Sequence, residues 1–386
     1  MENMILKNCR YQDFAEKIQR EGEKIIIYGA GMIGQVVVPS IWQQYGLEQS
    51  VLCYVDRDKS KSGQTIKIGA TPCEIKSPDM LSEVVGHITI LVTNSNFYPI
   101  IEFLDKLETL NQTEVYLFPL MQLEELKHAK HPELVKSSME PLIPKKIHYC
   151  WFSENPIPES LQKCIDSWKE KCPDYEIICW NESNYDVNRR RYTAEAYANQ
   201  KYGFVADVAR FDILYEHGGI YLDTDVELLK SLDEMLYQEA FIGTEKWGNI
   251  NSGGGCGAVP HQSMIKALLQ SRENLSFLRE DGKLNLDTNG IYETGVFLEH
   301  GFEVKNETQV INHMTVYPPK VFHPLDYITC EQSCVPETVS VHYFSGTWMD
   351  AKEIKNRTDT QDKYKKVLRR IEEQEGKANV RLSHRE

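Results

Sequence analysis

The sequence predicts an α/β protein in which two domains follow one another along the chain. Three observations favour this fold class. Short apolar runs alternate with helix-like segments between Lys24 and Phe118, and a glycine-rich turn follows the first of these runs. A second alternation of the same kind begins near Ile143, after a polar stretch that ends in two prolines. Because strands that alternate with helices build α/β sheets, we expect a small doubly wound parallel sheet in the first domain and an open α/β sheet in the second.

Length and charge restrict the possible functions. A chain of 386 residues is long enough for two domains that each bury a core. Its net charge of −14 argues against nucleic acid as a partner, since a phosphate backbone requires a basic surface. No apolar run reaches the ~18 residues of a membrane span, and the first residues, MENMILKNCRYQDF, lack the apolar core of a signal peptide. The ten cysteines form no CxxC pair, so we expect reduced thiols in a cytoplasmic protein.

The first domain carries a dinucleotide-type fingerprint. An apolar strand, Lys24–Tyr28, leads into GAGMIG at 29–34, where a nucleotide phosphate would meet a helix N-terminus. The next predicted strand, Val51–Val55, ends at Asp56, close to the ~20-residue spacing of a ribose-binding acid. Gly29, Gly31, Gly34 and Asp56 are therefore candidate cofactor-binding residues. The same glycines also serve close helix–strand packing in domains that bind nothing, so both interpretations stay open. Further strands are predicted at Ile88–Val92 and Val115–Phe118.

Composition sets the predicted boundaries. Charged residues dominate between Glu124 and Glu140, which predicts a solvated helix or linker, and Pro141 follows. Beyond Asp350, mixed charge with a sparse apolar stripe predicts a C-terminal helix. Its basic cluster, Lys363–Arg370, could bind an anionic membrane surface weakly, although interleaved acids favour a solvated helix. The predicted parts are a Rossmann-like domain at 1–122, a linker at 123–140, a second domain at 141–350 and a helical tail at 351–386.

The second domain opens with a strand at Ile143–Trp151, followed by a helix near Leu161–Lys171 and a strand at Tyr175–Trp180. Ligands of open α/β sheets bind at the carboxyl ends of the strands. A tryptophan at such an end can lay its ring against a flat base, so Trp151 is a candidate for stacking on a nucleobase. The alternative is a core tryptophan.

The stretch from Phe204 to Glu227, FVADVARFDILYEHGGIYLDTDVE, changes from a helical period to a short strand. Asp207 and Arg210 lie three residues apart on the flank of the predicted helix. Because side chains alternate along an extended segment, Asp223 and Asp225 can point the same way beyond the strand. Two convergent carboxylates suit Mg²⁺ or Mn²⁺, which complete their shells with phosphate oxygens. We therefore predict that these two aspartates bind a metal ion and, through it, a diphosphate.

The run ADVARFDILYEHGGIYLDTDVE at 206–227 resembles the core motif of glycosyltransferase family 32, the Och1-like and capsular-polysaccharide sugar transferases. It is also similar to a segment of the clostridial glucosylating toxins. The resemblance extends over about 143–348 and implies a GT-A fold, a UDP- or GDP-linked sugar donor, a divalent metal and retention of anomeric configuration. It further implies that Asp207 and Arg210 hold the donor sugar and that Tyr221 lies near the ribose. A structural salt bridge and a tyrosine bonded to the backbone are the alternatives.

The flanks of this resemblance supply the remaining candidates. Asn251 precedes Gly253-Gly254-Gly255 and could contact sugar or acceptor, or belong to a simple loop. The family's Gly-Pro turn ending in threonine corresponds to 287–294, where the proline is absent, so no role is carried over. The closing segment VHYFSGTW at 341–348 resembles the family's final motif, in which His342 would bind metal or diphosphate and Trp348 would close over the donor. A histidine ligand favours Mn²⁺ over Mg²⁺.

These features predict a metal-dependent hexosyltransferase that acts on a glycan or lipid-linked acceptor in bacterial surface polysaccharide synthesis, in the cytoplasm or at the inner face of the membrane. Asp225, with Asp223 alongside, would hold the ion that stabilises the departing nucleoside diphosphate. The sequence indicates no nucleophilic carboxylate. Two alternatives are a nucleotide-sugar or NAD-linked enzyme that acts through the first domain, which resembles a domain of bacterial sugar acetyltransferases, and an inactive module that binds sugar nucleotides.

Overall fold

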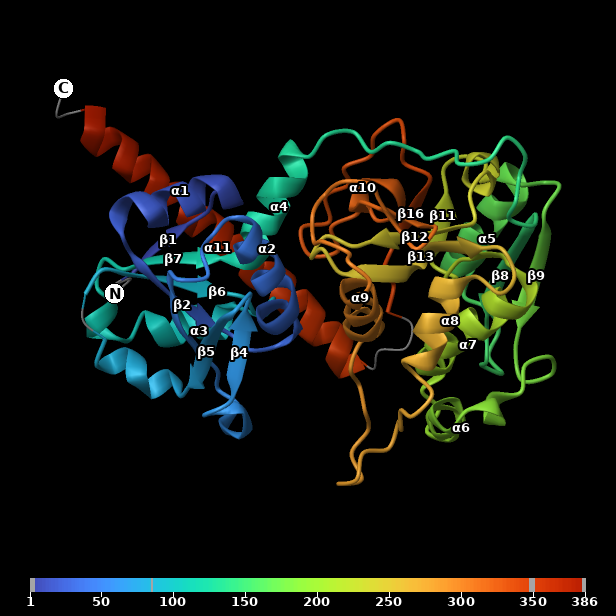
Figure 1. The fold of residues 1–386 in the computed structure, drawn as a ribbon, viewed down its shortest axis with the longest axis horizontal. Coiled ribbons are helices and arrows are strands. Elements are labelled where there is room, and N and C mark those ends of the chain that lie inside the picture. The colour runs from blue at the N-terminus through green and yellow to red at the C-terminus, as the bar shows by residue number, and fades with distance from the viewer. Residues whose placement is uncertain (1–3, 85, 347–350, 384–386) are drawn as a thin grey trace. The chain divides into compact units, whose positions relative to one another are not determined.

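A computed structural model describes the backbone of residues 4–84, 86–346 and 351–383. It divides the chain into two compact units (Figure 1). Unit 1 contains Met1–Ala129, Glu303–Lys305 and Lys352–Glu386, and unit 2 contains Lys130–Phe302 and Asn306–Ala351. The C-terminal segment therefore packs with the first unit, far from it in sequence, although we expected a separate tail.

Unit 1 is built on a seven-stranded sheet in the order β1-β7-β6-β2-β3-β5-β4, and every pair of neighbours is parallel except β4 with β5. The strand order reverses direction at β2, which lies between β6 and β3, as in a doubly wound sheet. The predicted strands at 24–28, 51–55 and 88–92 are confirmed, since continuous apolar runs are typical of strands covered on both faces. The bounds are β1 Ile5–Lys7, β2 Lys24–Tyr28, β3 Val51–Val55, β4 Thr65–Ile68, β5 Thr71–Lys76, β6 Ile88–Val92 and β7 Glu114–Leu117.

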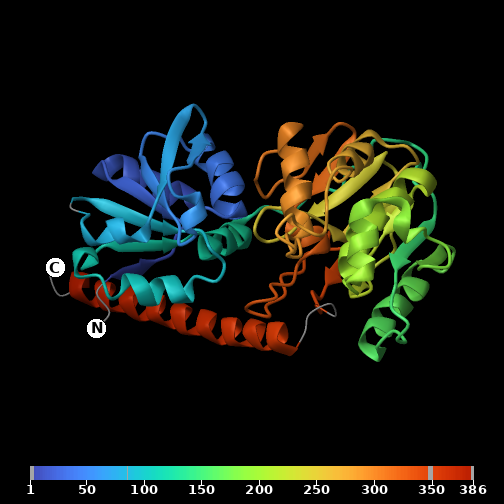
Figure 2. The ribbon, with the colours of Figure 1, turned by 90° about the horizontal axis from the view of Figure 1, so that it is seen from below.

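Helices cover both faces of this sheet (Figure 2). On one face, Tyr11 of α1 (Tyr11–Glu21) stacks on Phe118 of α4 (Phe118–His128), and Phe14 stacks on Trp42 of α2 (Val38–Gln44). On the other face lie α3 (Tyr98–Leu104) and α11 (Ala351–Ser383), and Tyr364 of α11 packs against Phe97. The sequence predicts an apolar stripe of Val367, Leu368 and Ile371 on this helix. Val367 and Ile371 are buried, as is Tyr364, and Leu368 is half-buried.

The glycine loop of unit 1 is held by contacts within the unit. The Thr93 hydroxyl donates to the Gly29 carbonyl at 2.8 Å, and Asp56 Oδ2 accepts from the Ala30 backbone N–H at 2.7 Å. Lys61 Nζ lies 3.5 Å from the same Asp56 oxygen. A Cβ at Gly34 would lie 2.0 Å from the Gly29 carbonyl oxygen. These contacts favour the packing role of the fingerprint over ligand binding. The helix after the loop begins as a π-helix at Ile33–Val37, and the ribose-binding role of Asp56 stays a prediction.

The second and third glycines of this loop, Gly31 and Gly34, offer a matched test. We expect Gly34→Ala to lower the stability of unit 1 by about 1–3 kcal/mol, because its Cβ would meet backbone that must shift. At Gly31 a Cβ would meet nothing within 4 Å, so Gly31→Ala should leave stability unchanged or slightly raised. Calorimetric unfolding of the full chain measures both. Equal transitions for the two variants would contradict the packing role of Gly34.

Unit 2 contains a second seven-stranded sheet, in the order β14-β15-β12-β13-β10-β8-β9. The strands β9, β8 and β10 run parallel, as do β15 and β12, whereas β13 runs antiparallel to both of its neighbours. The sheet is thus mixed. A two-stranded ribbon of β11 and β16 accompanies it. The bounds are β8 Lys146–Cys150, β9 Glu176–Trp180, β10 Gly219–Tyr221, β11 Val226–Leu228, β12 Ala240–Thr244, β13 Ile250–Ala258, β14 Gln309–Ile311, β15 Met314–Tyr317 and β16 Ser340–His342.

The helices of unit 2 lie on both faces of this sheet (Figure 1). α7 (Tyr202–His217), α8 (Ser263–Gln270) and α9 (Asn289–Glu299) cover one face, and α5 (Glu159–Lys171) and the short α10 (Pro319–Phe322) cover the other. α6 (Arg191–Ala198) packs on α7. The ion pair predicted on the flank of α7 is largely buried, since the Arg210 side chain is 4% exposed and the Asp207 side chain 20%. Buried charge on this central helix must therefore be compensated locally.

Candidate metal and sugar site

The acidic pair lies where strands of opposite direction meet. β8 and β10 end at the same edge of the sheet, and β13 begins there because it runs antiparallel to β10. The Asp223 backbone N–H donates to the Gly253 carbonyl at 2.9 Å, just beyond the paired residues of β10 and β13. On the other side of the pair, β11 begins at Val226, which lies opposite His342 of β16. Three segments that are distant in sequence thus converge on Asp223 and Asp225.

The two aspartates converge through a turn. The Val226 N–H donates to the Asp223 carbonyl at 3.1 Å, which closes a turn between β10 and β11. The predicted convergence holds, but strand alternation is the wrong reason for it. The Trp168 indole N–H of α5 donates to the Val226 carbonyl at 2.7 Å, so the buried helix fixes the exit from the turn. Asp225 is buried, and the Asp223 side chain is 27% exposed.

Asp225 lies among hydrogen-bond donors. One of its oxygens is 3.2 Å from His342 Nε2, and the other accepts from the Ser345 N–H at 2.7 Å and the Ser345 hydroxyl at 2.9 Å. Burial alone would raise the pKa of the Asp225 carboxyl, but His342 and Ser345 hold this pKa below its usual range. Burial opposes charging of His342, but Asp225 raises the pKa of the imidazole. Asp225 is therefore a carboxylate at neutral pH.

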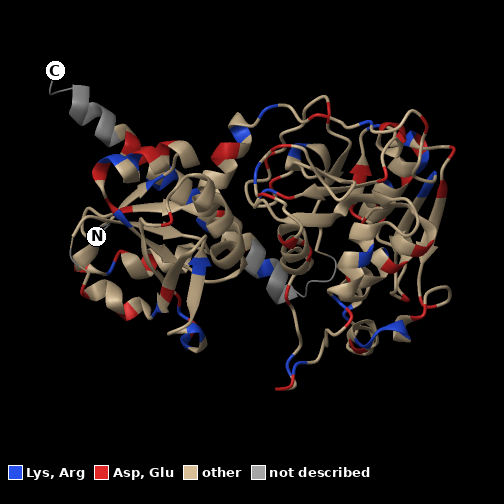
Figure 3. Ribbon diagram, in the orientation of Figure 1, with Lys and Arg blue, Asp and Glu red and all other residues tan. Residues whose placement is uncertain are grey.

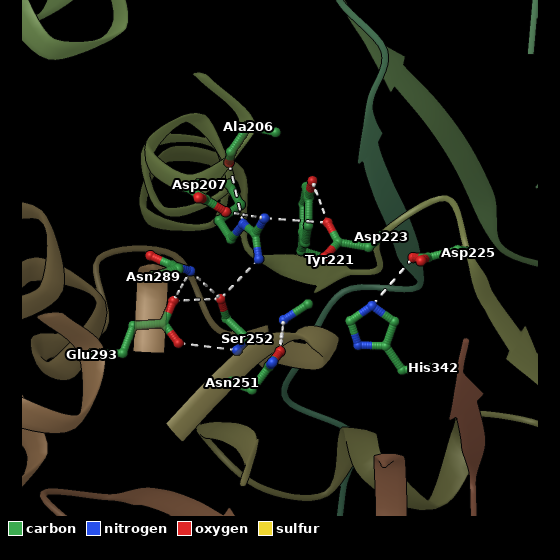
Figure 4. A network of polar contacts seen from close by, with 12 residues as sticks. Ala206, Asp207, Tyr221, Asp223, Asp225, Asn251, Ser252, Asn289, Glu293 and His342 are labelled. Carbon is green, nitrogen blue, oxygen red and sulfur yellow. Dashed lines mark hydrogen bonds and ion pairs between the residues drawn. The ribbon is translucent and has the colours of Figure 1, made fainter. Parts of the chain in front are cut away.

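The residues present fit a divalent cation. Asp223, Asp225 and His342 each offer one ligand atom, and these atoms lie within 4.8 Å of one another (Figure 4). His342 Nδ1 is buried without a hydrogen-bond partner among the described residues. A Cβ at Gly253 would lie 2.1 Å from Asp223 Oδ2, so the backbone leaves this position empty for the carboxylate. Two oxygen donors and one imidazole suit Mn²⁺.

A pair of glycine variants tests this arrangement. We expect Gly253→Ala to weaken Mn²⁺ binding about 10–100-fold, because the new methyl group would displace the Asp223 carboxylate. Gly295→Ala on α9 is the control, since a Cβ there would meet nothing within 4 Å. Titration of each variant with Mn²⁺ by calorimetry measures the difference. Unchanged affinity in the Gly253 variant would show that Asp223 does not contribute to a metal site.

Arg210 joins the two acidic groups of the site. Its Nη2 is 2.8 Å from Asp207 Oδ1 and 3.2 Å from Asp223 Oδ1. Its Nη1 donates to the Ser252 hydroxyl at 3.0 Å, and its Nε donates to the Ala206 carbonyl at 3.2 Å. A guanidinium has five N–H groups. Four of them are engaged by described residues, which leaves one N–H on Nη1 for a ligand.

The predicted aromatic contacts fall on the same edge. Trp151 follows β8, is partly exposed, and donates its indole N–H to the Asn155 carbonyl at 2.8 Å. Tyr221 is 1% exposed, and its hydroxyl lies 3.2 Å from Asp223 Oδ1. The Arg210 guanidinium lies over the Tyr221 ring, 4.8 Å from its centroid. Tyr221 thus supports the acidic pair and Arg210, while its predicted place near the ribose stays a prediction.

Asn251 bonds within the chain. Its Oδ1 accepts from the Gly253 N–H at 2.9 Å, and its Nδ2 donates to Glu245 Oε2 at 3.2 Å. Burial raises the pKa of Glu245. Glu245 had no predicted role, because only the turn between β12 and β13 brings it beside Asn251. Trp348, the predicted lid, lies outside the described residues.

The sequence also gave no signal for a cluster behind Arg210. Glu293, Asn289 and Ser252 bond to one another (Figure 4). The segment 287–294, expected to be a loop, instead leads into α9, and the Thr294 hydroxyl accepts from the Ile250 N–H at 3.0 Å. Helical spacing of Asn289 and Glu293 could have suggested that they share a face, but nothing in the spacing indicates β13 as their partner.

Acidic and basic residues interleave along the ribbon of each unit among the described residues (Figure 3). Over the same part of the chain, every helix is too short or too polar to cross a membrane.

Comparison with known proteins identifies the region around the site. Residues 158–242 match the family described as a glycosyltransferase sugar-binding region containing a DXD motif. The matched segment includes Asp207, Arg210, Tyr221, Asp223 and Asp225. His342 and the cluster around Glu293 lie beyond it.

Curated relatives match the chain over part of its length. The chain is 33% identical over 159 residues to inositol phosphoceramide mannosyltransferase 2 of Schizosaccharomyces pombe. The aligned segment covers 39% of this chain and 44% of that relative. The chain is 36% identical over 137 residues to mannosyl phosphorylinositol ceramide synthase SUR1 of Saccharomyces cerevisiae, covering 33% and 34%. The chain thus spans less than half the length of these relatives. A solved structure, PaToxG glycosyltransferase, aligns with a TM-score of 0.32 at 18% identity over 42% of this chain and 70% of that one.

Proposed function

We propose that this chain, which through residues 158–242 belongs to the glycosyltransferases whose sugar-binding region contains a DXD motif, transfers a hexosyl group from a nucleoside-diphosphate sugar to an acceptor hydroxyl. The observation that carries the proposal is the convergence of Asp223, Asp225 and His342 on one point beside Arg210. This arrangement places a cation site next to a buried guanidinium with one N–H to offer. A donor that combines a diphosphate with a sugar matches both.

Each residue has a defined task in this proposal. Asp223, Asp225 and His342 would hold the divalent ion, which when bound supplies Lewis-acid stabilisation of the departing diphosphate. Arg210 would donate its remaining N–H to the sugar, and Asp207 Oδ2, which accepts no hydrogen bond from a described residue, would accept from a sugar hydroxyl. Trp151, partly exposed at the same edge, would stack on the base.

The transfer exchanges one bond to the anomeric carbon for another. The acceptor oxygen bonds to that carbon while the bond from carbon to phosphate oxygen breaks. The departing phosphate oxygen keeps the electron pair of the broken bond and takes the acceptor proton. Because the acceptor proton goes to the departing oxygen, the acceptor would approach on the face from which the diphosphate leaves. Attack on that face would retain the anomeric configuration without a nucleophilic carboxylate. The anomer of the product, determined by NMR, tests it.

The names of the relatives indicate which donor to test first. Several of them are mannosyltransferases of inositol phosphoceramide, so a mannosyl donor is our first candidate. We propose a glycan or lipid-linked acceptor of bacterial surface polysaccharide synthesis, presented at the cytoplasmic face of the membrane. The acidic balance of the chain, with net charge −14, fits a sugar acceptor better than a polyanion.

A thermal-shift screen with GDP-mannose, UDP-glucose, UDP-galactose and UDP-N-acetylglucosamine, with and without Mn²⁺, tests the proposal. We expect one nucleotide class to stabilise the native protein only with metal, by about 2.7 kcal/mol at a hundredfold excess over Kd. Asp225→Asn should remove this shift and the slow hydrolysis of the donor, because the ion loses its buried carboxylate. Asp281→Asn, in an exposed turn, is the control. Small, equal shifts with every nucleotide that persist with a chelator would reject the proposal.

A further inference from the structure

We propose that Glu293 is a positioning residue for the donor sugar. Its carboxylate, acting through the Ser252 hydroxyl, sets the direction in which Arg210 presents its remaining N–H. This inference rests on the proposed function, because it gives Arg210 the sugar as its ligand. It adds a residue outside the matched segment 158–242, on a helix for which the sequence indicated no role.

The Glu293 carboxyl is enclosed by donors. The residue is fully buried on α9, where Oε2 accepts from the Ser252 N–H at 3.0 Å and Oε1 accepts from the Ser252 hydroxyl at 2.6 Å. The Asn289 side-chain amide, one helical turn earlier, also donates to Oε1 (Figure 4). All three donors are neutral, and Glu293 forms no ion pair with a described residue. A buried carboxyl held only by neutral groups is costly, so a packing role alone explains it poorly.

The Ser252 hydroxyl transmits the effect to Arg210. A hydroxyl has a single proton to donate. Because that proton points at Glu293, a lone pair of Ser252 Oγ faces Arg210 Nη1, 3.0 Å away. Nη1 carries the one N–H of the guanidinium that no described residue engages. The other N–H of Nη1 donates to Ser252 Oγ. Because the two N–H bonds of Nη1 keep a fixed angle, this hydrogen bond also sets the direction of the N–H that no described residue engages.

Protonation of Glu293 would break this relay. At Oε2 an added proton would meet the Ser252 N–H, and at Oε1 it would meet the Ser252 hydroxyl and the Asn289 amide, all of which are donors. If the carboxylic acid donated to Ser252 instead, the serine proton would have to turn toward Arg210, which is itself a donor. Either way the anchor on Nη1 is weakened.

The charges around Glu293 place this change in the physiological range. Asp207 and Arg210 of α7, Arg272 after α8 and Cys256 of β13 face it from the neighbouring elements. Burial raises the pKa of Glu293 to about 7, although Arg210, Ser252 and Arg272 oppose the shift. Donor-sugar recognition should therefore strengthen as the pH rises through neutrality.

The test is calorimetric titration of the protein with nucleotides in the presence of Mn²⁺. The affinity for GDP-mannose is compared with that for GDP, and the affinity for UDP-glucose with that for UDP. For Glu293→Gln we expect about tenfold weaker binding of the nucleotide sugar that the native protein binds, with the affinity for its parent diphosphate within about twofold. Ser252→Ala should behave in the same way. Glu299→Gln, at the exposed end of the same helix, is the control. Protonation of His342 would weaken metal binding for both ligands, so the pH test compares the ratio of the affinity for the sugar nucleotide to the affinity for its diphosphate. Between pH 8 and pH 6 this ratio should fall in the native protein and stay constant in Glu293→Gln.

Several outcomes overturn the inference. Equal weakening for sugar nucleotide and diphosphate would mean that Glu293 only supports the fold, and unchanged binding would mean that it has no role. Native protein that binds neither pair with metal would reject the proposed function and this inference with it.

A measurement of stability without donor separates a failure of the inference from a failure of the proposed function. The pKa of Glu293 is higher in the folded protein than in the unfolded chain, so the native protein loses stability as the pH rises from about 4.5 to about 7. Glu293→Gln lacks this group, so its melting temperature should rise relative to that of the native protein as the pH rises through this window. No relative rise would show that Glu293 does not titrate as inferred.

Discussion

Arg210 is a cation buried between two carboxylates, and its charge determines how the acidic edge of unit 2 can be built. A guanidinium loses the solvation of water on burial, which is tolerated only when its N–H groups find partners. Asp207 and Asp223 supply charge, and Ser252 and the Ala206 carbonyl supply neutral acceptors. Removing either aspartate would leave one Nη2 N–H of this buried cation without its acceptor. The same contacts hold Asp223 in place beside Asp225.

The backbone around this ion pair is equally constrained. Asp223 receives its position from the turn after β10, from the Gly253 carbonyl on β13 and from the absence of a side chain at Gly253. The position of His342 is set by the pairing of β16 with β11. The first residue of β11, Val226, is held in turn by a hydrogen bond from Trp168 of α5. The site is thus carried by strand ends and a buried helix, which hold side chains more precisely than a free loop does.

The sequence predicted the parts of this site that are local. Apolar runs located β2, β3 and β6 at their observed bounds, because strands covered on both faces are apolar throughout. The three-residue spacing of Asp207 and Arg210 indicated an ion pair on one side of a helix. The two-residue spacing of Asp223 and Asp225 indicated that both carboxylates lie close together. What could not be predicted depends on pairing between distant segments. Glu293 meets Ser252 across 41 residues, and the antiparallel course of β13 that joins them follows from the tertiary fold.

Charge balance explains why a metal belongs at this edge. Asp207, Asp223 and Asp225 face Arg210 and His342, so even a protonated His342 leaves the described groups at the site with a negative sum. A diphosphate entering such a site would be repelled, since charges a few Å apart interact strongly where water is excluded. A divalent cation bound by His342 as a neutral imidazole would cancel this negative charge and give the acidic groups and the diphosphate a common partner. Arg210, already shared between two carboxylates, could not do this with its single remaining N–H. In the proposed function Arg210 therefore lies beside the sugar, and the cation holds the diphosphate.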